Sequence, residues 1–156
     1  MSVDLPPFQW LLDQHRDDVY RFLVATVGAQ EADDCFQETF MAALRAYPRL
    51  RDASNLRSWL LTIAHRKAID SARSRARQPM PVEDVPDAAA PAASEVDERL
   101  WQAVRTLPDK QRGAVLLHYV SDLAHAQVAR ILECSEEAAR RSAHEGIKKL
   151  RQEWQP

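Results

Sequence analysis

The sequence predicts an all-α protein in which two small helical domains are joined by a flexible, acidic linker rich in Pro and Ala. Apolar residues recur at helical spacing along most of the 156 residues. Only 3 Gly are present, and no long run alternates apolar with polar residues as a strand does. Residues 78–97 hold four Pro and five acidic residues, which favours an extended connector. We therefore expect domains at 1–77 and 95–156, with the linker at 78–94.

The first domain is expected to contain three helices. One helix runs over 8–27 and ends at the following Gly, and a second over 30–47 is stopped by Pro48. A polar loop then leads to a third helix over 55–77, with Ser54 as its N-cap. The residues expected to form the core of this domain share helical spacing: Trp10, Leu11, Val19, Phe22, Leu23, Ala32, Cys35, Phe36, Thr39, Phe40, Ala43, Tyr47, Trp59, Leu60, Ile63, Ala64, Ala68 and Ala72.

The third helix ends in a basic face. Arg66, Arg73 and Arg77 fall at i, i+7 and i+11 and so share one side of the helix. Asp70 lies on the same side and can pair with Arg66 or Arg73. Two interpretations stay open: the face binds an anionic partner, or the arginines only solvate the helix end and interact favourably with its dipole.

The formal net charge of −2 conceals patches of opposite sign. Residues 1–47 carry eight acidic and three basic side chains, 54–79 carry six basic and one acidic, and 82–98 carry six acidic and no basic ones. Local potential, rather than net charge, decides which partners a surface attracts. The near-neutral total therefore says little about what the chain binds.

The second domain is expected to hold a helix over 95–106 and another that is opened by Pro108. A short helix over 124–132 and a longer one over 136–154 follow, separated by a three-residue turn that ends in the N-cap Ser135. This order is that of a helix-turn-helix, although other helical hairpins give the same pattern.

The composition excludes several classes of protein. Hydrophobic residues make up 46% and charged residues 28% of the chain, as in soluble globular proteins, and no run is apolar enough to span a membrane. Cys35 and Cys134 have neither a CxxC partner nor a His at ligand spacing, so we expect reduced thiols, no metal site and a cytoplasmic location. The N-terminus lacks the pattern of a signal peptide.

Together these segments resemble the small bacterial sigma factors of the extracytoplasmic-function (ECF) type over nearly the whole chain. The segment ADDCFQETFMAALRAY is similar to the family's helix that docks on the clamp helices of core RNA polymerase. NLRSWLLTIAHRKAIDSAR is similar to the segment that melts the promoter and reads its −10 element. LPDKQRGAVLLHYVSDLAHAQVARIL, followed by CSEEAARRSAHEGIKKLR, is similar to the helix-turn-helix that reads the −35 element.

This resemblance implies a sigma factor that binds the clamp helices and flap of core RNA polymerase, recognises promoter DNA and directs promoter-specific initiation. An anti-sigma factor is a further expected partner, and neither a cofactor nor enzymatic activity is expected. The acidic linker resembles the family's connector that threads the polymerase cleft, where negative charge can mimic nucleic acid. Composition alone favours a plain solvated tether.

The resemblance also implies roles for individual residues. The loop before the third helix would hold a flipped −10 base while arginines follow the DNA backbone. The residues implied for the −10 region are Arg51, Ser54, Asn55, Arg66, Arg73, Arg75 and Arg77. Those implied for the −35 region are Arg140, Arg141, His144, Lys148, Lys149 and Arg151. Those implied for polymerase binding are Asp34, Gln37, Glu38 and Phe40, although Asp34 could instead favour a helix N-terminus.

Four positions depart from the family's pattern. Arg66 stands where Asn is usual, and Glu145 stands where a basic residue is common. Ala124 replaces a Ser cap, which costs about 0.5–2 kcal/mol unless Asp122 substitutes. Glu133 replaces the Gly of the turn and would be strained in a left-handed backbone. Because the last 22 residues carry a net charge of only +1, we infer weaker or differently specified −35 binding.

Two other functions remain open at this point. A sigma-like decoy that sequesters an anti-sigma factor is favoured by the weakly charged last helix but opposed by the basic segment 66–77. A stand-alone helix-turn-helix regulator would not need the first domain. An enzyme is not expected, because the sequence has no Gly-rich phosphate loop, nucleophile elbow or HExxH motif and its five His are scattered.

Overall fold

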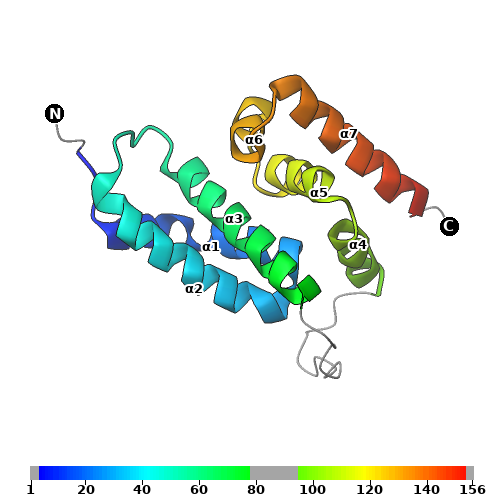
Figure 1. Cartoon of the computed structure of the whole chain (residues 1–156), viewed down its shortest axis with the longest axis horizontal. Helices are drawn as coiled ribbons and strands as arrows, with labels where there is room; N and C mark the ends of the chain where they lie inside the picture. The colour runs from blue at the N-terminus through cyan, green and yellow to red at the C-terminus, as the bar shows by residue number, and fades with distance from the viewer. Residues whose placement is uncertain (1–3, 78–94, 154–156) are drawn as a thin grey trace.

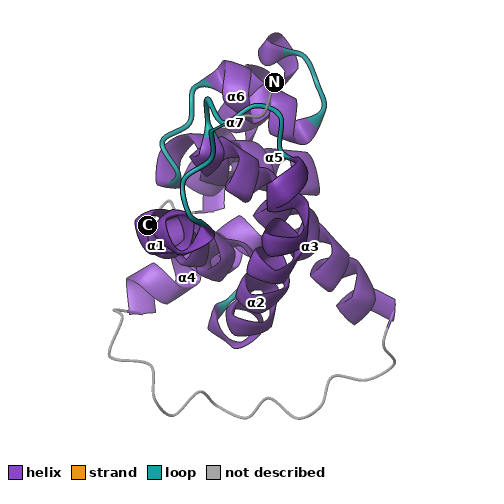
Figure 2. Ribbon diagram, turned by 90° about the vertical axis from the view of Figure 1, so that its left-hand side faces the viewer, coloured by secondary structure: helices purple, strands orange, loops and turns teal. Residues whose placement is uncertain are grey.

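The computed structural model describes residues 4–77 and 95–153, and every regular element within them is a helix (Figures 1 and 2). The elements are α1 (Phe8–Val27), α2 (Ala29–Ala46), the 3₁₀ turn η1 (Tyr47–Arg49), α3 (Leu56–Arg77), α4 (Glu95–Arg105), α5 (Asp109–Val115), the π-helical turn η2 (Leu116–Val120), α6 (His125–Leu132) and α7 (Glu136–Glu153). The predicted all-α fold class is confirmed. The linker predicted at 78–94 lies outside the described residues.

Helices α1, α2 and α3 pack against one another as the first bundle (Figure 1). The turn between α1 and α2 is a single residue, Gly28, whose φ of 87° is readily reached only without a Cβ. The core holds Leu11, Phe22, Leu23 and Leu60, all fully buried. The apolar faces of these three helices thus meet in a shared core.

Two predicted core residues lie at the surface instead. Trp10 is 46% exposed because it lies in the first turn of α1, where its ring contacts only the edge of His15 among the aromatic pairs of the described chain. Ala72 is exposed near the end of α3. Conversely, Leu61 is fully buried although the pattern did not select it, because α3 is packed by α1 and α2 and also by α6.

The start of α3 is capped by Asn55 rather than by the predicted Ser54. The Asn55 side-chain oxygen accepts the backbone N–H of Ser58 at 3.0 Å. The backbone N–H of Ser54 instead donates to the Asp52 carboxylate at 2.9 Å, which tightens the preceding loop. Both residues can cap a helix, so the one-residue shift was decided by this local turn.

Helices α4 to α7 form the second bundle, and α6, its turn and α7 have the predicted helix-turn-helix order (Figure 1). Glu133 closes α6 with φ 57° and ψ 48°, so the anticipated left-handed strain is present. Ser135 caps α7 as predicted, since its hydroxyl accepts the N–H of Ala138 at 3.0 Å. Ala124 has no side-chain acceptor, but Gln127 accepts the Ala124 N–H at 3.2 Å and supplies half of a capping box.

The two bundles are docked on each other. Contacts join α1 to α4 and to η2, and α3 to α6. The buried apolar residues of both bundles belong to one hydrophobic cluster, including Phe22 and Leu61 on one side and Leu117 and Val128 on the other. The placement of α3 therefore depends on both bundles.

Candidate nucleic-acid and polymerase interfaces

The predicted basic end of α3 splits into two faces. Arg66 and Arg73 are exposed and line a cleft of about 360 Å³ that the second bundle closes on its other side. Arg75 points towards α2, where its Nε lies 3.8 Å from the carboxylate of Glu31. Part of the positive charge of this segment is therefore paired with a carboxylate of the first bundle.

Asp70 does not neutralise the cleft arginines in the way its spacing allowed. No ion pair joins Asp70 to Arg66 or Arg73 within residues 4–77, although all three line the same cleft. Arg77 donates through Nε to the backbone oxygen of Arg73 at 3.3 Å, which uses one of its N–H groups at the helix end. The guanidinium groups of Arg66 and Arg73 thus keep donors that can reach an anion.

The loop before α3 presents Arg51, Ser54 and Asn55 at the surface. The Asn55 oxygen is already used as the helix cap, which leaves its amide N–H₂ free to face a partner. The pKa of Asp52 is lowered, first by hydrogen bonding from the Ser54 side chain and then from the Ser54 backbone. The loop is thus a folded turn that holds an ionised carboxylate.

Helix α2 carries an exposed face that only partly matches the predicted polymerase contacts. Asp34, Gln37 and Glu38 are exposed. Met41 and Leu44 are 57% and 55% exposed, and the sequence reasoning missed both. Their spacing from Gln37, at i+4 and i+7, was a signal that could have found them, because it places them on one side of the helix.

Phe40, which was expected both in the core and at the polymerase surface, lies in the core of the first bundle. It is only 7% exposed, and its ring lies 4.8 Å from that of Phe36 and 6.4 Å from that of Phe8. A side chain enclosed in this way has little surface to offer a partner. Phe40 belongs to the apolar stripe that predicted α2 as amphipathic, and it packs in the core with that stripe.

Helix α7 brings four of its predicted residues to one groove of about 450 Å³. Ala143 and Ile147 of α7 form part of its floor, and Tyr119 and His125 of the preceding elements complete it. The predicted residues that line this groove are Arg140, His144, Lys148 and Arg151. Arg141 and Lys149 are exposed on α7 but do not line the groove.

Two arginines of α7 pair with carboxylates of their own helix. Arg140 lies 3.1 Å from Glu136, and Arg141 lies 3.8 Å from Glu137. Both pairs have i, i+4 spacing and highly exposed side chains, so each contributes little stability and can rearrange. Glu136 and Glu137 thus account for part of the charge dilution noted in the sequence, and Glu145 and Glu153 lie further along α7.

A pair of stacked histidines lies beside this groove and was not predicted. The rings of His118 and His125 are 3.9 Å apart and nearly parallel, and His118 Nδ1 lies 2.8 Å from the Leu123 carbonyl oxygen. The pKa of His125 is lowered by burial and then by His118 and Arg140. His125 therefore favours the neutral form beside a basic groove.

Comparison with known proteins identifies both bundles. Residues 11–78 match the family model of Sigma-70 region 2, and residues 97–150 match that of Sigma-70 region 4. The ECF RNA polymerase sigma factor SigM of Bacillus subtilis (strain 168) is 31% identical over 136 residues, covering 81% of this chain and 82% of that protein. RNA polymerase sigma factor CarQ of Myxococcus xanthus is 29% identical over 155 residues, which cover 93% of this chain and 87% of that protein.

A solved structure has the same fold. The sigma factor RpoE from Bartonella quintana, in complex with the anti-sigma factor NepR, aligns with a TM-score of 0.75 at 21% identity, covering 93% of this chain and 94% of that one. The chain belongs to the ECF RNA polymerase sigma factors. It is thus an initiation factor rather than an enzyme, and it binds core RNA polymerase and directs promoter-specific transcription.

Two further observations concern the described residues. None of their helices is both long enough and apolar enough to cross a membrane. Their His, Cys, Asp and Glu side chains do not gather into a group of three or more that could hold a metal ion.

Proposed function

We propose that the chain acts in the cytoplasm as a sigma subunit whose two bundles divide promoter recognition between them. Residues 1–77 would bind core polymerase and read and melt the −10 element, residues 78–94 would form the linker, and residues 95–156 would read the −35 element. The observation that carries this proposal is the order of two sigma regions, 11–78 and 97–150, along one chain.

For the polymerase surface we propose the exposed face of α2. Asp34, Gln37 and Glu38 stay in the set, and Met41 and Leu44 replace the buried Phe40. Acidic side chains beside exposed apolar ones fit a protein partner, because the apolar side chains gain from burial while the charges steer association. The proposed partner of this face is the clamp helices of core polymerase. The proposed partner of the second bundle is the polymerase flap.

For the −10 element we propose the loop before α3 together with the α3 arginines. Arg66 and Arg73 have guanidinium groups available for phosphate, and Arg51, Ser54 and Asn55 lie at the mouth of the loop. We also propose that Arg75 and Arg77 contact the DNA backbone. Arg75 would have to leave its ion pair with Glu31 in order to bind a phosphate. Single-stranded DNA suits a set of arginines that follows a backbone.

For the −35 element we propose α7 as the recognition helix. Arg140 and Arg141 lie in its N-terminal half, the part that approaches base edges in helix-turn-helix proteins. His144, Lys148, Lys149 and Arg151 follow as phosphate contacts. Since Glu136 and Glu137 pair with the two arginines, DNA must displace these carboxylates, which supports the expectation of weaker −35 binding.

We propose an anti-sigma factor as the regulatory partner of this chain. The support is the fold shared with Bartonella quintana RpoE, which was solved with the anti-sigma factor NepR. Such a partner would have to cover surfaces that polymerase or DNA needs.

The proposed function is tested by adding the purified chain to core polymerase that lacks any sigma factor. Run-off transcripts from a library of promoter fragments are expected to appear only when the chain is present. A blank across the whole library, together with retained core binding, would favour a decoy over a productive initiation factor.

A further inference from the structure

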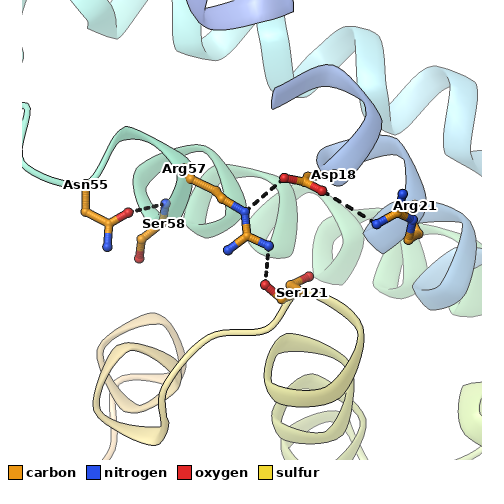
Figure 3. Close-up of polar contacts among 6 residues, drawn as sticks. All are labelled: Asp18, Arg21, Asn55, Arg57, Ser58 and Ser121. Carbon is orange, nitrogen blue, oxygen red and sulfur yellow. Dashed lines mark hydrogen bonds and ion pairs between the residues drawn. The ribbon is translucent and has the colours of Figure 1, made fainter. Parts of the chain in front are cut away.

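One arginine of α3 joins the two bundles by hydrogen bonds. Figure 3 shows that Arg57 donates through Nε to the Asp18 carboxylate of α1 at 2.9 Å and through Nη2 to the backbone carbonyl oxygen of Ser121, which follows η2. The other Asp18 oxygen lies 3.6 Å from Arg21. Because α1 and α3 are tied to the second bundle in this way, a cleft between the bundles has walls of defined geometry.

A cleft of about 360 Å³ between the bundles, here called the arginine cleft, carries three guanidinium groups on its walls. Arg75 comes from α3, Arg105 from the end of α4 and Arg112 from α5. Like charges around so small a space repel one another, and an anion between them relieves the repulsion. The other described residues that line this cleft include no carboxylate: they are Thr26, Val27, Ser71, Ala72 and Ala76.

Arg112 is positioned by contacts within its own bundle. It is 8% exposed, its Nη1 donates to the backbone oxygens of Arg105 at 3.0 Å and Leu107 at 3.3 Å, and its Nη2 donates to Asp109 at 2.7 Å. These contacts use three of the five guanidinium N–H groups. The Asp109 side chain is 60% exposed and lines the cleft of Arg66 and Arg73, so its carboxylate is not among the groups that line the arginine cleft.

Arg105 and Arg75 have N–H donors available for a ligand. A Cβ on Gly28 would stand 3.8 Å from Nη1 of Arg105, so this guanidinium lies against the turn between α1 and α2. Within residues 4–77 and 95–153, the Arg105 side chain makes no hydrogen bond or ion pair. Arg75 Nε lies 3.8 Å and Ser71 Oγ 3.5 Å from the Glu31 carboxylate, and contacts this long can be redirected to a stronger acceptor.

We propose that the arginine cleft is a binding site for a phosphate group, which Arg105 and Arg112 hold with Arg75 at the edge. Guanidinium N–H groups match the spacing of phosphate oxygens, and their hydrogen bonds to a charged acceptor are strong ones. The volume suits a small phosphorylated compound. A phosphate of the DNA backbone has the same chemistry. The proposed function gives Arg105 and Arg112 no part, so this site can be tested separately from it.

The experiment titrates the full chain with inorganic pyrophosphate by isothermal titration calorimetry, at an ionic strength kept constant with sodium chloride. Arg105→Gln is expected to weaken pyrophosphate binding at least about tenfold, because charge-assisted hydrogen bonds to the anion are lost. Arg105→Lys is expected to bind with intermediate affinity, because it keeps the charge without the planar fork. Circular dichroism is expected to show an unchanged helical content in both variants.

The matched control is Arg99→Gln, which removes the same charge from an exposed position of the same helix. Its affinity for pyrophosphate is expected to stay within about twofold of that of the wild type, because salt screens an exposed charge outside the cleft. Equal weakening by Arg99→Gln and Arg105→Gln would show that only the overall charge attracts the anion, and would overturn the site.

A second titration, with a labelled single-stranded oligodeoxythymidylate followed by fluorescence anisotropy, distinguishes the two sources of phosphate. If the site takes a free compound, Arg105→Gln weakens pyrophosphate binding and leaves oligonucleotide binding unchanged. If it takes the DNA backbone, Arg105→Gln weakens oligonucleotide binding and pyrophosphate competes with the oligonucleotide. No pyrophosphate binding by the wild type, together with unchanged oligonucleotide binding by Arg105→Gln, would overturn the proposal.

The failure of the proposed function has a separate signature. A wild-type chain that binds pyrophosphate through Arg105 but does not bind single-stranded DNA would keep the arginine cleft and reject the assignment of Arg66 and Arg73 to DNA. In contrast, oligonucleotide binding that depends on Arg66 and Arg73 but not on Arg105, without any pyrophosphate binding, would keep that assignment and reject the cleft.

Discussion

At the scale of single residues, Glu133 is held in a conformation that suits a glycine. Its φ of 57° and ψ of 48° lie in the left-handed region, which costs a residue with a Cβ about 1–2 kcal/mol. The chain keeps this residue at the turn of its helix-turn-helix, where the carboxylate also lines the cleft with Arg66 and Arg73.

Glu133→Gly is expected to raise the free energy of unfolding by about 1 kcal/mol, because the strain at the turn is relieved. Urea unfolding followed by circular dichroism measures the change. Glu133→Ala is the control, since it removes the same carboxylate and keeps the Cβ. A gain of equal size in both variants would show that charge, rather than backbone strain, is responsible.

His65 is expected to make the stability of the docked form depend on pH. Its pKa is lowered by burial and then by Arg112 of α5, with Asp109 of α5 opposing the shift and Arg66 of α3 adding to it. Its Nδ1 is buried and has no hydrogen-bond partner among the described residues. Because the lowered pKa disfavours the charged form, its contribution to stability is present above the ordinary pKa of about 6.5 and is lost as the pH falls below it.

The wild type is therefore expected to lose stability between about pH 7 and pH 5, and His65→Gln is expected to lose less. Urea midpoints measured across this range give the two curves. His15 and His125 also have lowered pKa values, so the stability of both proteins is expected to fall with pH because of them. The difference between the two curves therefore reports the contribution of His65. Parallel curves would contradict a role for this imidazole.

At the scale of elements, α2 separates a buried core stripe from an exposed stripe that is the proposed polymerase surface. Ala32, Cys35 and Ala43 are buried against α1 and α3. Met41 and Leu44 point away from that core. Adjacent positions such as Phe40 and Met41 thus differ in burial, because consecutive residues of a helix are about 100° apart around its axis.

Phe40→Ala is expected to lower the free energy of unfolding by about 3–5 kcal/mol, the usual result of emptying a buried aromatic position. Met41→Ala is expected to change it by less than about 0.5 kcal/mol and to weaken binding to core polymerase instead. Thermal unfolding and a core-binding titration measure the two effects. Weakened polymerase binding by a fully folded Phe40→Ala, with none by Met41→Ala, would reverse the assignment.

At the scale of the whole molecule, the proposed surfaces for polymerase and for DNA lie on different helices of the first bundle. The proposed polymerase surface is on α2, whereas the cleft arginines of α3 line a cleft together with residues of α5 and α6. In Figure 1, α3 lies between α2 and the second bundle. This separation allows one bundle to hold polymerase and a melted strand at the same time. It also predicts that the two activities can be lost independently.

Reversing charge with Arg73→Glu and Arg77→Glu is expected to lower open-complex formation at least tenfold, because phosphate attraction becomes repulsion. Core binding should remain within about twofold, because neither residue lies on α2. Permanganate footprinting of the melted strand and a core-binding titration provide the two measurements. Loss of core binding together with loss of melting would place the polymerase surface on α3.

Much of the fold followed from local patterns. Most helix bounds were predicted to within a residue or two, because apolar spacing, Gly28 and Pro48 act over a few positions. The helix expected after Pro108 instead ends at Val115 and continues as the π-helical turn η2. Ser54 was the wrong cap, because an Asx turn at Asp52 moved the start of α3 by one residue. Trp10 was wrong as a core residue, because periodicity marks a face without saying whether a neighbour covers it.

The candidate sites were harder to predict than the helices. Residue type and spacing placed Arg66 and Arg73 on one face, yet they could not show that Asp109 and Glu133 stand across from them. Arg75 was grouped with them because it is basic, whereas its position on the helix turns it towards Glu31. Such pairings depend on which helices become neighbours.

The sequence by itself determined the helical class, the helix-turn-helix, the alternation of acidic and basic segments and the resemblance to ECF sigma factors, because each depends on residues close together in the chain. Tertiary structure alone decided that Met41 is exposed and that Arg57 joins α1 to the Ser121 carbonyl. These outcomes depend on packing between segments that are 39 and 64 residues apart for Arg57, and helical periodicity carries no information over such separations.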